Sequence, residues 1–173
     1  MINIIKTRFI KGVVTRAIAK STVVPELETL GAELRKEIKK KFGRSLHIRE
    51  VDTGSCGACE SEIISANNAI YDIQRFGVNF VASPRHADAL MVTGPVSKNM
   101  LLALKKTYEA MPIPKFVVAV GDDACDGGIY KGSYAVLGGV DKILPVDMKI
   151  PGNPPSPKEI LRGLFALVKN ASK

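Results

Sequence analysis

The sequence has no tryptophan, a single glutamine, and only three cysteines and two histidines in 173 residues. An odd number of cysteines in a chain of this length does not suggest a disulfide framework, so we interpret the thiols as ligands or reactive groups. Neither His47 nor His86 has the spacing that is usual in zinc sites. The positions of the cysteines therefore matter most for function.

Long apolar stretches are also missing. No part of the sequence reaches the ~18 consecutive apolar residues expected of a transmembrane helix. Lys6, Arg8 and Lys11 interrupt the start of the chain, which lacks the small-residue cleavage site of a secretory signal. We therefore expect an intracellular protein.

The net charge of +8 is concentrated near the start of the sequence. Residues 1–44 hold 11 Lys and Arg but four Asp and Glu, whereas residues 45–173 are close to neutral. Apolar residues recur among basic ones over 1–20 and again over 25–43, which predicts a basic, helical N-terminal arm at residues 1–44. Such an arm is suited to anionic lipid, nucleic acid or an acidic partner, and a simple solvated helix is the plain alternative.

From residue 46 onwards, short apolar segments alternate with helical patterns. We predict strands at 46–52, 78–82, 87–94, 115–121 and 142–147, and helices at 60–73, 96–111 and 158–170. This alternation indicates βαβ units and a parallel sheet, so residues 45–173 are predicted to form one α/β domain.

The cysteines come directly after predicted strands. Cys56 and Cys59 follow the strand at 46–52, and Cys125 follows the strand at 115–121. Open parallel sheets bind ligands at the carboxyl ends of their strands, so these thiols are expected at one edge of the sheet. Spacing alone leaves four interpretations open, namely an iron–sulfur cluster, zinc, a redox dithiol and structural thiols.

Four ordered segments give the sequence a specific resemblance. VDTGSCGACESEI (51–63) resembles the first cluster-binding loop of the small subunit of energy-converting, membrane-bound [NiFe]-hydrogenases. SPRHADALMVTGPV (83–96) resembles a segment that this subunit shares with its complex I counterpart. VGDDACDGGIY (120–130) and ILPVDMKIPGNPPSPKEIL (143–161) resemble the second cluster loop and the last loop with the final helix.

This resemblance implies a fold, a cofactor and partners. The fold is a flavodoxin-like open parallel sheet with flanking helices. The cofactor is a proximal [4Fe–4S] cluster, which receives electrons from a ferredoxin-like iron–sulfur subunit and passes them to a large catalytic hydrogenase-like subunit. The assembly is an obligate hetero-oligomer with membrane subunits of an ion-translocating arm, and this chain is a peripheral subunit at the cytoplasmic face of the cell membrane.

The sequence departs from the family at two of the four cluster ligands. Cys56 and Cys59 match the first two, but Asp123 and Asn153 stand where the family has cysteines, and Cys125 lies close to the former. Three outcomes remain open. A [4Fe–4S] cluster could use Cys56, Cys59 and Cys125 with Asp123 or Asn153 as the fourth ligand, a three-iron cluster could use the three thiolates, or the cluster could be lost.

The resemblance also suggests a proton path. Glu62 matches a glutamate that hydrogenases place near the cluster and use in proton passage. The plain alternative is a solvated helix residue.

We therefore predict an electron-transfer subunit of a ferredoxin-dependent, ion-translocating membrane oxidoreductase, not catalytic alone. The complex would be of the hydrogen-evolving type or resemble the archaeal membrane-bound sulfane sulfur reductases. One alternative is a cluster-less structural subunit. Another is a complex I-type quinone-reducing subunit, which the C-x2-C spacing disfavours because complex I members typically carry adjacent cysteines. Nucleic-acid binding would depend on the basic arm alone, and it is not expected.

Overall fold

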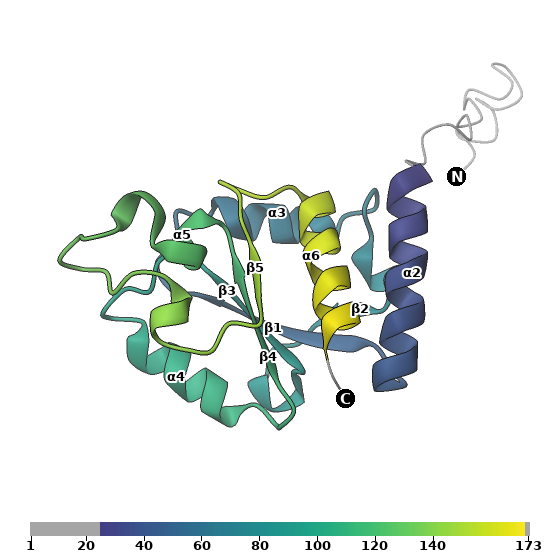
Figure 1. Ribbon diagram of the computed structural model, residues 1–173, viewed down its shortest axis with the longest axis horizontal. Coiled ribbons are helices and arrows are strands. Elements are labelled where there is room, and N and C mark those ends of the chain that lie inside the picture. Colours follow the sequence, from purple (N-terminus) through teal and green to yellow (C-terminus); the bar gives the residue numbers. More distant parts are fainter. Residues whose placement is uncertain (1–24, 172–173) are drawn as a thin grey trace, which may run out of the picture.

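Five parallel strands form the centre of the molecule (Figure 1). The structure is a computed structural model that describes residues 25–171. The strands are β1 (Leu46–Asp52), β2 (Val78–Phe80), β3 (Ala89–Thr93), β4 (Phe116–Val120) and β5 (Met148–Ile150), in the spatial order β2-β1-β3-β4-β5. All four neighbouring pairs are parallel. This is the flavodoxin-like order of a doubly wound sheet, so the predicted fold class is confirmed.

Helices cover both faces of the sheet. One face carries α2 (Pro25–Phe42), α3 (Ala58–Ala66) and α6 (Pro157–Asn170), whose apolar residues share one core cluster with β1 and β2. The other face carries α4 (Leu101–Ala110) and the short α5 (Asp122–Asp126), which contribute to a second cluster. The sheet thus separates two cores, and a side chain can belong to only one of them.

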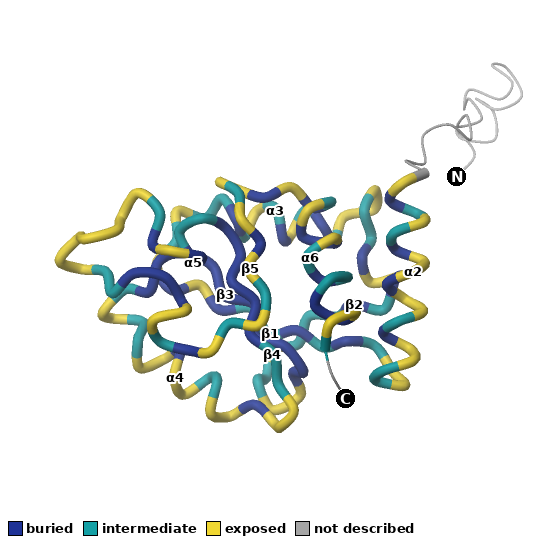
Figure 2. The backbone as a smooth tube through the Cα atoms, viewed as in Figure 1, coloured by how far each residue is buried: buried dark blue, intermediate teal, exposed yellow. Residues whose placement is uncertain are grey.

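The central strands are buried on both faces, as Figure 2 shows in dark blue. All five residues of β3 are buried, with Met91 in the first core and Leu90 and Val92 in the second. Near-continuous apolar strands of this kind are typical of parallel sheets between two helical layers. The sheet is therefore a rigid support for the loops at its edges.

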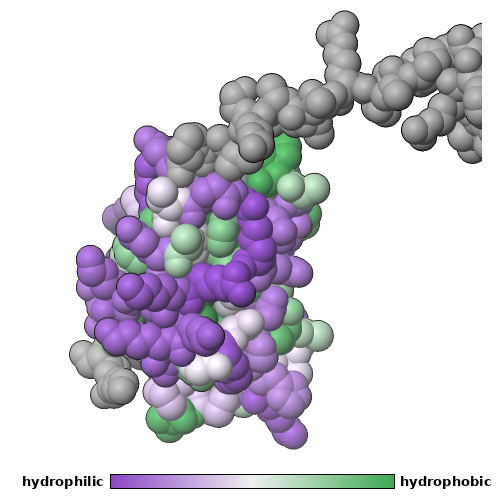
Figure 3. Space-filling model, turned by 90° about the vertical axis from the view of Figure 1, so that its right-hand side faces the viewer, coloured by the Kyte–Doolittle hydropathy of each residue, from purple (hydrophilic) through white to green (hydrophobic). Residues whose placement is uncertain are grey.

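Helix α2 forms part of this packing. Leu27, Leu34 and Ile38 are buried in the first core, as their spacing predicts, and α2 packs against α6. An ion pair between Glu26 and Lys158 joins the two helices, and the face on the α2 side is mostly hydrophilic (Figure 3). The predicted helix at 1–20 lies outside the described residues, and the domain division at residue 44 remains a prediction.

One predicted strand is wrong. Residues 142–147 are not a strand, because the fifth strand is β5, where Met148 and Ile150 pair with Val118 and Val120 of β4. The 3-10 turn Val140–Lys142 leads into this segment, whose Leu144 is buried in the second core. Pro145 lacks the N–H that a strand would donate.

Helix boundaries also differ from the prediction. α3 ends at Ala66, where the backbone turns back through Asn67 and Asn68, and α4 begins only at Leu101. Of the helices in residues 25–171, none is long and apolar enough to cross a membrane.

Candidate functional site

Three loops meet at the carboxyl edge of the sheet. They follow β1, β4 and β5, and two of them are bonded to each other. The Asp122 amide donates to the Gly152 carbonyl at 2.9 Å, and the Gly152 amide donates to Asp122 Oδ1 at 2.8 Å. The loops after β4 and β5 therefore hold a fixed spacing through reciprocal bonds within the protein.

The loop after β1 is equally constrained. Asp52 Oδ1 accepts hydrogen bonds from the amides of Gly54 and Ser55, both at 2.7 Å, and the buried Thr53 hydroxyl donates to the Thr93 carbonyl at 2.8 Å. Gly94 has φ +70°, and a Cβ there would collide with the backbone of Ser55. This loop thus lies between the ends of β1 and β3, the topological switch point where such sheets bind ligands.

Two cysteines lie on this loop and on α3. Cys56 is exposed, whereas Cys59 is buried and belongs to the first core. A Cβ on Gly121 would lie 2.5 Å from Cys59 Sγ, so the loop after β4 passes directly over this thiol. Burial raises the pKa of Cys59 to about 12, with further contributions from the negative charges of Glu60 and neighbouring groups that include Asp122 and Asp123.

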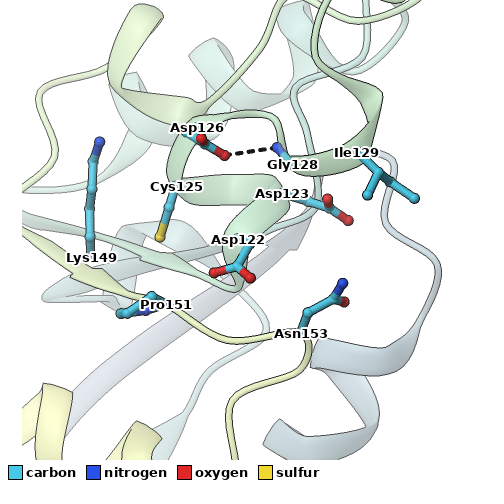
Figure 4. A pocket seen from close by; sticks show the side chains of 9 residues that line it. All are labelled: Asp122, Asp123, Cys125, Asp126, Gly128, Ile129, Lys149, Pro151 and Asn153. Atoms are coloured by element: carbon cyan, nitrogen blue, oxygen red, sulfur yellow. Dashed lines mark hydrogen bonds between the residues drawn. The ribbon is translucent and has the colours of Figure 1, made fainter.

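Cys125 lies elsewhere. It belongs to the second core, on the opposite side of the sheet from Cys59, and its Sγ donates a weak bond to the Ala119 carbonyl at 3.7 Å. Burial raises the pKa of Cys125 to about 11. Figure 4 shows Cys125 and Asp123 leaving α5 in different directions. The two sulfur atoms of Cys59 and Cys125 thus have separate environments.

Asp123, at the position of a family cysteine, has an unsatisfied atom. Its Oδ1 is buried and has no hydrogen-bond partner among the described residues. Burial raises the pKa of this carboxyl, while the Ile129 amide opposes the shift. A buried polar atom without a partner is costly, and in a native protein it often indicates a missing ion or ligand.

A hollow of about 560 Å³ opens beside Asp123 (Figure 4). Both sequence-predicted oxygen donors, Asp123 and Asn153, line it together with Cys125. Its other walls come from α5, the turn that follows it and β5: Asp122, Asp126, Gly128, Ile129, Lys149 and Pro151.

The donors at this edge fit an iron–sulfur cluster better than a single ion. Among residues 25–171, no three His, Cys, Asp or Glu side chains are close enough to hold one metal ion. Thiolates hold a multi-iron cluster through different iron atoms, so its ligands lie farther apart. Cys56, Cys59 and the unsatisfied Asp123 Oδ1 are anionic donors of the right chemistry, on two loops that Gly121 brings together.

Sequence reasoning missed two neighbouring carboxyl groups, those of Glu60 on α3 and of the half-buried Glu50 on β1. Both carboxylate oxygens of Glu60 are buried without a hydrogen-bond partner within the described chain. Burial, helped by the charges of Glu60 and Asp52 and opposed by Arg49, raises the pKa of Glu50 to about 7. Glu50 lies within β1, and its position inside a predicted strand was the available signal. Glu62 is half-buried on α3.

The chain matches a family model and several known proteins. The family model described as "NADH ubiquinone oxidoreductase, 20 Kd subunit" matches residues 56–167. An uncharacterized protein of Methanocaldococcus jannaschii is 46% identical over 138 residues, which cover 80% of this chain and 91% of that protein. A probable membrane-bound hydrogenase subunit of Pyrococcus furiosus is 42% identical over 137 residues, which cover 79% of this chain and 82% of that protein.

A solved structure is similar as well. It is the membrane-bound sulfane sulfur reductase, described as an archaeal respiratory membrane complex. One of its chains matches with a TM-score of 0.66 and 34% sequence identity, covering 79% of this chain and 75% of that chain.

Proposed function

The chain belongs to the family of the NADH ubiquinone oxidoreductase 20 Kd subunit, and from this premise we propose that it transfers electrons within a membrane-bound oxidoreductase complex, through one iron–sulfur cluster. Its relatives include subunits of hydrogenase-like complexes and of NADH-quinone oxidoreductases. The single observation that carries the proposal is the unsatisfied Asp123 Oδ1 beside the cysteine loop at the switch point of the sheet.

We propose Cys56, Cys59 and Asp123 as ligands of the cluster. Cys125 and Asn153, which line the same hollow as Asp123, are the candidates for the remaining ligand. When bound, the cluster supplies reversible one-electron transfer. The protein's own residues exclude water from Cys59, fix the loops by the Asp122–Gly152 bonds, and offer a carboxylate whose buried oxygen has no other partner.

The type of complex is inferred from a hydrogenase-like relative and from the similar solved structure. We propose a ferredoxin-dependent, ion-translocating complex that evolves hydrogen or reduces sulfane sulfur, with this chain as a peripheral subunit at the cytoplasmic face. It would contact a large catalytic subunit, a ferredoxin-like iron–sulfur subunit and membrane subunits. The hydrogenase-like relative and the similar sulfane sulfur reductase chain support this choice.

A cluster-less structural subunit is the second candidate. It is favoured by the Asp122–Gly152 bonds, which close the edge without any metal, and by Cys125, whose thiol is packed in the second core. In that case the chain would keep the fold and the interfaces but carry no electrons.

Two measurements on the native complex distinguish an electron-transfer subunit from a structural one. They are the content of iron and labile sulfide, and the electron paramagnetic resonance spectrum of the reduced form. We expect one cluster signal to disappear in Cys59→Ser and in Asp123→Ala, and to change its g values in Asp123→Cys. The matched control is Asp126→Asn, an exposed carboxylate on the same short helix, which should leave the signal unchanged. Unaltered iron and spectra in all four variants would establish the structural role instead.

A further inference from the structure

A second hollow lies at the opposite edge of the sheet from the cysteines. Its volume is about 490 Å³, and three separate segments line it, with the residues Arg44, His47, Val81, Arg85, His86 and Pro112. Arg44 comes just before β1, and the SPRH turn comes just before β3, so these residues lie at the amino ends of the strands. The hollow is therefore distinct from the candidate cluster site.

The lining is basic, and the Asp88 carboxylate beside it is already bonded. Both oxygens of Asp88 accept from the Arg44 guanidinium, at 2.8 and 2.7 Å, and Oδ2 also accepts from the His47 amide at 2.9 Å. Asp88 thus neutralises Arg44 and fixes its orientation. The Ser83 hydroxyl accepts from the Arg85 amide, but no described residue forms an ion pair or hydrogen bond with the Arg85 guanidinium, so this exposed group keeps an uncompensated positive charge.

The His47 imidazole is held against the backbone of the SPRH turn. His47 Nδ1 lies 3.2 Å from the His86 carbonyl oxygen, and because a carbonyl only accepts, Nδ1 must carry the hydrogen. The backbone of the SPRH turn is bonded internally, from the His86 amide to the Ser83 carbonyl and from the Ala87 amide to the Pro84 carbonyl. Arg85 and His86 are therefore presented by an ordered backbone.

An apolar residue projects beside this basic hollow. Ile113 follows the lining residue Pro112 directly in the chain and is 88% exposed. An exposed ion pair contributes less than about 1 kcal/mol, so a free anion would bind weakly at so open a site. A protein that covered both Ile113 and Arg85 would exclude water from them, and arginine beside apolar side chains is typical of such interfaces.

We propose that this hollow docks a segment of a partner subunit that carries a carboxylate side chain next to an apolar one. The carboxylate pairs with Arg85 beside the two imidazoles, and the apolar side chain packs on Ile113 and Pro112. The proposal depends on the chain being a subunit of a complex, which is part of the proposed function, but not on the cluster.

Photo-crosslinking in the intact complex tests it. A photo-reactive amino acid at position 113 should crosslink to another subunit, at a peptide with Asp or Glu near the attachment point, identified by mass spectrometry. The matched control is the same probe at Leu102, an exposed residue at the other end of α4, which should not yield that peptide. A crosslink to lipid, to a segment without an acidic residue, or no crosslink in a complete complex would overturn the proposal.

A charge-reversal variant provides a second test of the proposal. Arg85→Glu should lower the yield of the position-113 crosslink about fivefold, the effect of losing ~1 kcal/mol at an interface rim. Replacing the crosslinked acid by lysine in the same complex should restore the yield. Lys98→Glu, at an exposed site outside the hollow, is the control and should leave it unchanged. An unchanged yield in Arg85→Glu would overturn the pairing, whereas a chain that purifies without partners would overturn the proposed function as well.

Discussion

The three thiols of this chain are chemically unlike one another. Cys56 is exposed, while Cys59 and Cys125 are buried in separate cores, and burial raises the pKa of Cys59 to about 12 and that of Cys125 to about 11. Thiolates are the nucleophilic and metal-binding form, so assembly of the proposed cluster would have to remove a proton from Cys59 at a site that opposes its charge. Bound iron would supply the compensating positive charge.

Alkylation of the cluster-free chain should follow this order. With iodoacetamide near neutral pH, we expect Cys56 to react at least about tenfold faster than Cys59 and Cys125, because reactivity follows exposure and thiolate content. Peptide mass spectrometry at timed quenches measures the rates, and the urea-unfolded chain is the control in which all three should react alike. Equal rates in the folded chain would contradict the burial of Cys59 and Cys125.

Glu50 should make stability depend on pH. Burial, then Glu60 and Asp52, raises its pKa from 4.5 to about 7 against the influence of Arg49, so the folded chain binds this proton more tightly than the unfolded chain. The contribution of Glu50 to stability is therefore fully present below about pH 4.5 and is lost as pH rises through about 7.

Thermal unfolding at several pH values tests this. Between about pH 5 and 8, the melting temperature of the wild type should fall relative to that of Glu50→Gln, which cannot lose the proton. Glu33→Gln, an exposed residue of α2, serves as the control and should parallel the wild type. Parallel curves for Glu50→Gln and wild type would show that Glu50 is ionised in the folded state.

At the level of elements, α2 packs against the sheet layer through residues that its sequence spacing identified. Leu34 of α2 is fully buried in the first core. We expect Leu34→Ala to lower the free energy of unfolding by about 2–5 kcal/mol, through lost burial and a residual cavity. Glu33→Ala, its exposed neighbour, should change it by less than about 0.5 kcal/mol.

Urea unfolding at low micromolar concentration measures both variants. The result also tests the division of the chain at residue 44, because a helix belonging to a separate arm would unfold independently. A loss below ~1 kcal/mol for Leu34→Ala would support the separate arm, and a cooperative loss would place residues 25–44 in the α/β unit.

The sequence predicted a helix or strand well wherever the burial of its residues produced a regular spacing of apolar side chains. β1, β3, β4 and α6 lie where apolar alternation or helical spacing placed them, and Pro157 and the Ser156–Glu159 capping box mark the start of α6. The strand near 142–147 was misplaced because Leu144 is buried in a turn and not in the sheet. Local hydrophobicity does not distinguish these two kinds of burial.

Part of the candidate site was also predictable from the sequence, because the order of the strands determines which loops meet. Strand order places Cys56, Cys59 and Asp123 at one edge, and this follows from topology. That Cys125 packs in the other core depends on the direction in which α5 presents each side chain, which spacing alone did not indicate.

At the scale of the whole molecule, exposed apolar side chains surround the candidate site. Ile129 and Tyr134, on the loop after α5, are 81% and 90% exposed. The loop is drawn in yellow at the left of Figure 2. Exposed apolar groups of this kind mark surfaces that a partner covers.

The isolated chain should therefore self-associate. We expect sedimentation of the purified chain to show concentration-dependent oligomers, and the double variant Ile129→Ser with Tyr134→Ser to shift the population toward monomer. Leu102→Ser is the control, because Leu102 is 62% exposed but lies in the first turn of α4 and not on the loop after α5, and it should have a smaller effect. A monodisperse monomer at all concentrations would contradict a partner-covered edge.

The reciprocal bonds between Asp122 and Gly152 have a consequence for the history of such proteins. Because the polypeptide itself clamps the two loops, neither metal nor thiolate is needed to keep them in register. A lineage could then exchange one donor at a time, cysteine for aspartate or asparagine, without passing through an unfolded ancestor. The fold can thereby be kept while the ligands of the redox site change. Relatives with different electron acceptors can then share one architecture.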